Sequence, residues 1–373
     1  MSRRLLPQVR LYQKLRSAHL ERAHQQTPAS LLYVEQRYDY DPALAAGLDV
    51  VRAGTWRAAA LVARSRVRVL EINEPLVRIG LLRTLTTVLA ARGSARLRRQ
   101  PVHVVAYAIE NRDPFSTPLV SRVPLLGPAR DAVHRRLTRL VARWTDRVAY
   151  GTPASRALYT ELLGRELASA TSTLVPALPA ACDCGPLTEG TPTDAVYVGA
   201  FEERKGVPQL LAAWPRVHAA EPGATLTLIG TGPLTDAVRV FAADRPEVTV
   251  LVDPPRERIH AQLRRAGTLV MLSQPRARWR EQVGLPLVEG LQHGCRVVTT
   301  DQTGLAQWLA AAGHAVIDST ADARTTADVL VATLRSGRTA EQVLADLPAV
   351  DGRLAADRWL FAAGEPAQTK EDT

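Results

Sequence analysis

The chain contains very little lysine. Only three of its 47 basic residues are lysine, namely Lys14, Lys205 and Lys370, and the remainder are arginine. A codon-composition bias explains such a preference, and against this background an internal lysine stands out. Because a compact ammonium and a planar guanidinium recognise ligands differently, Lys205 becomes a candidate functional residue.

Cysteine is also scarce. Cys182, Cys184 and Cys295 are too few to form a disulfide framework. The Cys182-Asp-Cys184 pair has no second pair of ligands at the spacing of a zinc motif, so we expect unliganded thiols and no metal site. His293 lies beside Gly294, where we expect a histidine that caps the end of a helix.

Long apolar runs are absent. No run approaches the roughly 18 residues that a transmembrane helix needs, and no short apolar segment follows the N-terminal arginines. The composition, 46% hydrophobic and 23% charged, is typical of a globular protein. We therefore expect a soluble, cytoplasmic protein with room for two domains.

Acidic residues are scarce in the first half. Residues 1–170 carry 28 basic and 13 acidic residues, whereas residues 181–373 carry 19 and 24. This asymmetry indicates an anionic partner for the first half. We expect no nucleic acid, because a nucleic-acid motif is missing and aromatic residues make up only 5% of the chain. Peripheral contact with an anionic membrane surface, or a phosphate-bearing acceptor, fits better, and a solvated arginine-rich surface is the alternative.

The pattern of apolar residues predicts an α/β fold with two Rossmann-like, doubly wound domains, because strands and helices alternate along the chain. The basic segment 1–28 has rough helical spacing and predicts a helical extension that docks on the domain or lies on a membrane surface. The further expected parts are an N-terminal domain at 29–177, a Pro-, Gly- and Thr-rich linker at 178–194, a C-terminal domain at 195–345, and a helix with a tail at 346–373. In the N-terminal domain we expect strands at 31–34, 67–72, 102–109 and 147–150, and helices at 57–63, 79–91 and 129–144.

Lys205 lies in the segment Gly199-Ala-Phe-Glu-Glu-Arg-Lys-Gly206, directly after the predicted strand 195–198. In an open α/β sheet ligands bind at the C-terminal edge of the strands, and this position brings Arg204 and Lys205 to that edge. We interpret the two residues as phosphate-binding cations. A solvated pair in a turn is the alternative.

A second glycine segment, Gly230-Thr-Gly232-Pro, follows the apolar strand 225–229. The third glycine of the dinucleotide fingerprint is missing, so a site of that kind is not predicted. Gly230 and Gly232 either let the backbone approach a nucleotide or phosphate closely, or form a purely structural turn.

Two carboxylates are separated by seven residues in Glu281-Gln-Val-Gly-Leu-Pro-Leu-Val-Glu289. The apolar run 268–272 before them and Gly294 after them predict a strand, a loop and a helix that begins near Leu285. Glu281 then lies beside the exposed N–H groups of the helix, and Glu289 lies about one turn inside. Carboxylate acceptors beside N–H donors suit a ligand with hydroxyls and phosphate, such as a nucleotide sugar. The alternative is an ordinary βαβ unit with two solvated glutamates.

Together these segments resemble the signature of retaining, family-4-like glycosyltransferases of the GT-B fold, which carry an E-x7-E and a Gly-x-Gly-Pro segment. The family's lysine segment reads roughly Gly-Arg-Leu-x-x-x-Lys-Gly, which Gly199, Lys205 and Gly206 match. Ala200 replaces the family's arginine, and the neighbouring Arg204 is a candidate to supply the guanidinium. The resemblance is strong over 195–308 and implies two domains that face each other across a cleft.

The resemblance implies a retaining hexosyltransferase of polysaccharide biosynthesis. Such an enzyme moves a sugar from a nucleotide-diphosphate sugar to a glycan or lipid-linked acceptor, without a metal and with no cofactor besides the donor. Arg204 and Lys205 would neutralise the developing phosphate charge, and Glu281 would orient the donor sugar. Glu289 would hold the ribose. The other donor-binding residues implied are Gly199, Gly230, Gly232, Val283, Gly284, Leu285, Thr303 and Gly304.

The N-terminal domain departs from the family's pattern. Members commonly have a glycine-rich loop after the first strand, but the segment 35–42 contains no glycine. They also carry a histidine after the fourth strand, where this chain has Glu110 and Asn111. These two residues either bind a sugar hydroxyl of the acceptor or serve as turn and cap residues. Two alternative functions remain open: a catalytically inactive GT-B binding or scaffold protein, and a GT-B nucleotide-sugar epimerase.

Overall fold

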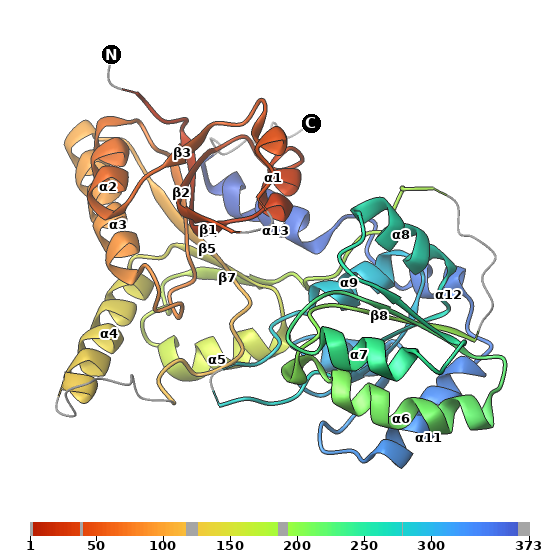
Figure 1. Cartoon of the computed structure of the whole chain (residues 1–373). Helices are drawn as coiled ribbons and strands as arrows, with labels where there is room; N and C mark the ends of the chain where they lie inside the picture. Colours follow the sequence, from red (N-terminus) through yellow and green to blue (C-terminus); the bar gives the residue numbers. More distant parts are fainter. Residues whose placement is uncertain (1–2, 38–39, 117–125, 186–192, 278, 365–373) are drawn as a thin grey trace, which may run out of the picture. The chain divides into compact units, whose positions relative to one another are not determined.

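Two parallel sheets, one in each of two units, organise the chain in the computed structural model (Figure 1). The structure describes residues 3–37, 40–116, 126–185, 193–277 and 279–364. Unit 1 comprises Met1–Pro176 and Arg353–Thr373, and unit 2 comprises Ala177–Gly352. Among the helices in the described ranges, none combines the length and the apolar character that crossing a membrane requires.

Unit 1 contains a seven-stranded sheet in the order β3-β2-β1-β4-β5-β6-β7, and all neighbouring strands are parallel. Its strands are β1 (Gln8–Leu15), β2 (Ser30–Gln36), β3 (Val50–Arg52), β4 (Val69–Ile72), β5 (His103–Ala108), β6 (Arg147–Tyr150) and β7 (Thr171–Leu174). Its helices are α1 (Ser17–Ala23), α2 (Thr55–Arg64), α3 (Leu81–Arg98), α4 (Leu126–Arg143), α5 (Pro153–Leu163) and α13 (Gly352–Phe361). The four strands and three helices predicted for this domain are therefore confirmed.

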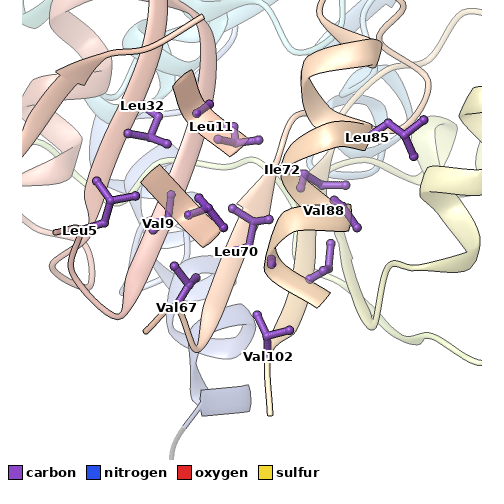
Figure 2. Close-up of a cluster of buried hydrophobic side chains, with 14 of the residues drawn as sticks. Leu5, Val9, Leu11, Leu32, Val67, Leu70, Ile72, Leu85, Val88 and Val102 are labelled. Atoms are coloured by element: carbon purple, nitrogen blue, oxygen red, sulfur yellow. The ribbon is translucent and has the colours of Figure 1, made fainter. Parts of the chain in front are cut away.

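Helices cover both faces of the unit 1 sheet. Successive strand residues point to opposite faces, so Leu70 of β4 packs with Val62 of α2 and Val88 of α3. Its neighbour Val69 packs with Leu360 of α13 on the other face. Figure 2 shows Leu70 and Val88 in the first of these clusters, and Figure 1 shows α13 beside the N-terminal strands. The sheet is therefore doubly wound, as predicted.

The helical extension expected over residues 1–28 is not present. Gln8–Leu15 forms β1, an interior strand between β2 and β4, and the short α1 follows it. Arg10 explains the error, because this side chain is only 1% exposed although it lies in a strand that reads as basic. Its guanidinium pairs with Glu71 at 3.0 Å and also with Asp357. A charge is buried only where it is paired, and the partners lie too far along the chain for a local pattern to reveal them.

The position of β1 also changes which loop follows the first strand of this domain. The segment 35–42, in which a glycine-rich loop was sought, comes after β2. Only one residue, Arg16, separates β1 from α1, which begins with Ser17. This connection too contains no glycine, so the departure from the family's pattern holds at the corrected position.

Unit 2 contains a six-stranded parallel sheet in the order β10-β9-β8-β11-β12-β13. Its strands are β8 (Asp194–Val198), β9 (Thr225–Ile229), β10 (Val248–Leu251), β11 (Thr268–Met271), β12 (Arg296–Thr300) and β13 (Ala315–Ile317). Its helices are α6 (Val207–Ala220), α7 (Thr235–Ala242), α8 (Arg256–Arg265), α9 (Leu285–Gln292), α10 (Ala306–Ala311), α11 (Ala323–Leu334) and α12 (Ala340–Ala345). Counted within the unit, the strand order is 3-2-1-4-5-6, that of a Rossmann sheet. The order reverses between β8 and β11, and this switch point is where such sheets bind ligands.

The helices of unit 2 lie on both faces of its sheet. Tyr197 of β8 packs with Trp214 of α6 and Leu330 of α11. The adjacent Val198 packs on the opposite face with Leu263 of α8 and Leu287 of α9. The predicted strands and the predicted helix start near Leu285 agree with the structure. Residues 186–192 of the expected linker and 365–373 of the expected tail lie outside the described residues.

Candidate functional site

Lys205 and Glu281 meet at the switch point of the unit 2 sheet. Lys205 ends a 3-10 turn that follows β8, and Glu281 follows β11, which pairs with β8. The two side chains form an ion pair in which each is 12% exposed. Because parallel neighbours end at the same edge of a sheet, residues 76 positions apart come into direct contact.

Two residues that sequence analysis did not single out complete this cluster. The Trp279 ring centroid lies 4.5 Å from Cζ of Arg204 and 5.3 Å from Nζ of Lys205, within the range of cation–π attraction. Ser273 Oγ lies 3.5 Å from a Glu281 carboxylate oxygen. Trp279 could have been found from the sequence as an aromatic residue among arginines at a predicted strand edge. Ser273 carries no comparable signal.

Gly206 allows the turn that carries Lys205 to lie against the end of β11. Its φ is +76°, and a Cβ at this position would lie 1.9 Å from the carbonyl oxygen of Leu272. The backbone N–H of Gln274 donates to the carbonyl of Arg204 at 2.9 Å and fixes the two loops together. A residue with a side chain would therefore push the Lys205 turn away from Glu281.

The other glycines of the two motifs have a structural reason. A Cβ at Gly230 would lie 1.8 Å from the carbonyl oxygen of Gly199, and one at Gly232 would lie 2.6 Å from that of Phe201. The backbone N–H of Phe201 donates to the carbonyl of Thr231 at 3.0 Å. The turns after β8 and β9 therefore pack backbone against backbone, and this contact explains the glycines without a ligand.

The loop that carries Glu281 is held against the loop after β12. Thr303 Oγ1 donates to the carbonyl of Val283 at 2.8 Å. The Gly304 N–H lies 3.2 Å from the carbonyl of Glu281 and 3.0 Å from that of Gln282. The structure thus places Thr303 and Gly304 next to Glu281, but their hydrogen bonds order this loop.

The helix α9 begins directly after this loop. Gly284 is its N-cap residue with φ +85°, and Leu285, the first residue of the helix, is exposed. The first N–H groups of a helix have no carbonyl partner within the helix, and they carry a partial positive charge. The start of α9 therefore suits a phosphate group.

Glu289 lies just over one turn inside α9, as predicted. Its side chain is 25% exposed, and a carboxylate oxygen lies 3.9 Å from the Arg256 guanidinium at the start of α8. Among the charged residues to which the resemblance gives a role, the structure joins Lys205 and Glu281. It gives Glu289 an ion-pair partner on another helix.

The arginines that precede Glu281 make separate contacts. Arg276 pairs with Glu203 at 2.6 Å, and Arg280 donates to the carbonyl of Asp301 at 3.3 Å. Arg204 itself pairs with Glu202 at 2.5 Å. Arg278 lies outside the described residues.

In unit 1, Glu110 and Asn111 lie in a turn that Glu74 organises. The N–H groups of Ile109 and Glu110 each donate to Glu74 at 2.9 Å, and the Arg112 N–H donates to Glu110 at 3.1 Å. Burial raises the pKa of Glu74 to about 7, although the two N–H donors act in the opposite direction. These contacts give Glu110 the role of a turn residue, and a role of Glu110 and Asn111 in acceptor binding stays a prediction.

Comparison with solved structures supports the architecture. The structure is similar to that of Alr3699/HepE from Anabaena, which was solved in complex with UDP, with a TM-score of 0.56, 11% identity, and coverage of 95% of this chain and 97% of that one. It is also similar to the pneumococcal O-GlcNAc transferase GtfA in complex with UDP and GlcNAc, with a TM-score of 0.54, 11% identity, and coverage of 83% and 59%. The chain has the GT-B fold.

The sequence of the second domain is similar to that of a known family. Residues 192–336, which lie in unit 2, match the family described as glycosyl transferases group 1. A segment of 123 residues is 32% identical to glycogen synthase of Mycobacterium tuberculosis (strain CDC 1551 / Oshkosh). This match covers 31% of the present chain and 28% of the length of glycogen synthase.

Proposed function

We propose that the chain is a retaining glycosyltransferase that moves a sugar from a nucleotide-diphosphate sugar to a glycan or lipid-linked acceptor, without a catalytic metal. The observation that carries the proposal is the Lys205–Glu281 pair at the switch point of a domain that matches the family of glycosyl transferases group 1. A half-buried ammonium beside a carboxylate, next to the start of α9, is suited to a ligand that combines phosphate with hydroxyls.

The chemistry follows from charge. As the bond between sugar and diphosphate breaks, negative charge collects on the phosphate oxygens. The Lys205 ammonium and the N–H groups at the start of α9 stabilise that charge, and Arg204 adds a second cation. On donor binding, Lys205 exchanges its partner Glu281 for phosphate, which leaves the Glu281 carboxylate to accept a hydroxyl of the sugar. Glu289 holds the ribose in this scheme.

The nature of the donor and acceptor forms the second part of the proposal. Two structural neighbours hold UDP, so a UDP-sugar is the first donor to test. Unit 1 would bind the acceptor. The excess of basic residues over 1–170 favours an acceptor that bears phosphate or is linked to a lipid at an anionic membrane surface.

The test is the Lys205→Ala variant, assayed for release of nucleotide and for transfer with a panel of UDP-, GDP- and ADP-sugars. Loss of a preorganised charge at the leaving group should lower kcat by about 10²–10³-fold. Lys14→Ala is the matched control, because Lys14 lies in unit 1 in a loose pair with Glu35 at 3.8 Å and should leave transfer unchanged. Full transfer by Lys205→Ala would refute the assigned role.

The two alternatives give different results in the same assay. A wild-type protein that binds a nucleotide sugar in a thermal-shift screen but never turns it over would be a binding protein, and the proposal would fail. A changed sugar in the donor, formed without acceptor, would indicate an epimerase.

A further inference from the structure

Unit 2 brings together four side chains of the types that bind zinc. Cys182 and Cys184 lie in the segment that precedes β8, His260 lies in α8, and His293 is the C-cap residue of α9. One ligand atom from each residue lies within 4.8 Å of all the others. A zinc tetrahedron with Zn–S of about 2.3 Å and Zn–N of about 2.0–2.1 Å has edges of roughly 3.3–3.8 Å, so shifts of about 1 Å complete the geometry.

The hydrogen bond of His293 fixes which of its nitrogens faces the cluster. Nδ1 lies 2.6 Å from the carbonyl oxygen of Glu289, and because a carbonyl only accepts, Nδ1 carries the proton. Nε2 is then the acceptor nitrogen, and it lies 3.2 Å from Sγ of Cys184. A carbonyl that holds the second nitrogen of a histidine is the usual outer-shell partner of a metal ligand. The His260 ring meets the His293 ring edge to face, with centroids 4.9 Å apart.

Donors also point at the two sulfur atoms. The backbone N–H of Cys184 lies 3.3 Å from Sγ of Cys182, and the Arg264 guanidinium lies 2.9 Å from Sγ of Cys184. Donors of this kind also serve as outer-shell partners of a metal-bound sulfur. The N–H of Cys182 donates to the carbonyl of Gln292 at 2.8 Å, which anchors the cysteine segment to the end of α9.

We propose that Cys182, Cys184, His260 and His293 bind one structural zinc ion. Two thiolates and two imidazoles in a tetrahedron are the donor set of structural zinc, and the two thiolates balance its charge. Binding releases one proton from each thiol. The sequence predicted no such site because the cysteines are closer than in a zinc finger and the two histidines come from different helices, which only the fold brings together.

The ion would add a direct link between three segments: the stretch before β8, α8 and α9. The site lies at the C-terminal end of α9, about 12 Å along the helix from the start that faces the switch point. The ion therefore has a structural role and takes no part in sugar transfer. This inference depends on the geometry of unit 2 and not on the proposed function.

The experiment measures metal in the full-length protein, reduced and dialysed against metal-free buffer after loading with Zn²⁺. We expect one equivalent of zinc per chain, measured by elemental mass spectrometry. Loading with Co²⁺ should give the visible d–d bands of a tetrahedral ion and a thiolate-to-cobalt charge-transfer band. Cys184→Ala removes one ligand at an exposed position, so the fold should persist while affinity for either ion falls at least about 10-fold.

Cys295→Ala is the matched control, because Cys295 is buried and its thiol faces the carbonyl of Leu263 at 3.3 Å. This variant should keep one equivalent of zinc and the cobalt spectrum. Wild-type protein that binds neither ion, or a Cys184→Ala variant with undiminished zinc, would overturn the proposal. Hydrogen exchange gives a second readout, since a chelator should increase exchange in α8 and α9 of the wild type and leave Cys184→Ala unchanged.

Discussion

The strand order of unit 2 recurs in unit 1, where β7 adds a seventh strand, but the ion-pair groups described for the two units lie in different places. In unit 1 one cluster of ion pairs lies inside: Arg10 and Arg353 flank Glu71, and Asp357 completes the buried group. In unit 2 the charged pair Lys205–Glu281 lies at the open edge of the sheet. The strand order alone therefore does not determine where ion pairs lie in a domain. The candidate site is recognised by the charged side chains that lie at the C-terminal edge of the strands.

The same contrast applies to the backbone at the switch point. In unit 2 a short turn follows β8 and ends at Gly206, which has a positive φ. In unit 1 the helix α1 begins directly after β1, and His19 of α1 stacks on Tyr12 with ring centroids 4.6 Å apart. The units therefore differ after their first strands, whereas α3 of unit 1 and α9 of unit 2 both begin after a glycine with positive φ, Gly80 and Gly284.

The largest effect should come from breaking the buried group of unit 1. Asp357→Ala leaves one positive charge in excess among Arg10, Glu71 and Arg353, which should lower the free energy of unfolding by about 3–5 kcal/mol. Glu221→Ala in unit 2 is the control, because its partner Arg335 is 59% exposed, and it should lose at most about 1 kcal/mol. Hydrogen exchange in β1 measures the effect within unit 1. Equal stability of the two variants would contradict the proposed difference between a buried and an exposed ion pair.

A smaller effect should follow from adding one methyl group at the switch point of unit 2. Gly206→Ala combines a strained positive φ with a Cβ 1.9 Å from the Leu272 oxygen, so we expect a loss of about 2–4 kcal/mol and weaker donor binding. Gly93→Ala in the exposed face of α3 meets no atom within 4 Å and should stabilise unit 1 by about 0.5–1 kcal/mol. Denaturant unfolding and nucleotide binding separate the two. A neutral Gly206→Ala would show that the turn has room to move.

The smallest effect concerns pH. The pKa of Glu74 is raised by burial to about 7 from an ordinary value of 4.5, so the folded state favours the protonated acid. Its contribution to stability is complete below about pH 4.5 and is lost as the pH rises through 7. Since the side chain is half-buried, Glu74→Gln should reduce the loss of stability between pH 5 and pH 8 by about 1–2 kcal/mol. The control Glu35→Gln, in the loose pair with Lys14, should keep the slope of the wild type. The same slope in both variants would assign the titration to another group.

Those parts of the site could be predicted from the sequence whose chemistry follows directly from neighbouring residues. The segments around Lys205 and Glu281 each combine an apolar strand, a glycine and a charged residue, so both the strand ends and the residues at the edge could be predicted. Their direct contact could not, because it requires β8 and β11 to be neighbours in the sheet. Trp279 was missed for a related reason, since its cation–π contacts depend on Arg204 and Lys205, which the fold places near its ring.

Residues whose role depends on a partner far along the chain could not be predicted. Arg10 makes β1 look like a solvated helix, and only Glu71 and Asp357 show that it belongs inside. Cys182 and Cys184 have no predicted ligand partners in the sequence, whereas in the structure α8 and α9 place two histidines beside them. The periodicity of apolar residues predicts local helices and strands well, but it carries no information about contacts between residues far apart in the sequence.

The salt bridge between Arg10 and Asp357 spans 347 positions of the chain. During synthesis the guanidinium of Arg10, in an interior strand of the first sheet, therefore lacks this carboxylate until almost the whole chain has left the ribosome. The second sheet contains all its strands within 194–317 and can assemble earlier. The order of completion is thus the reverse of the order of translation, and a nascent chain held short of Asp357 would present a finished second domain beside an unfinished first one.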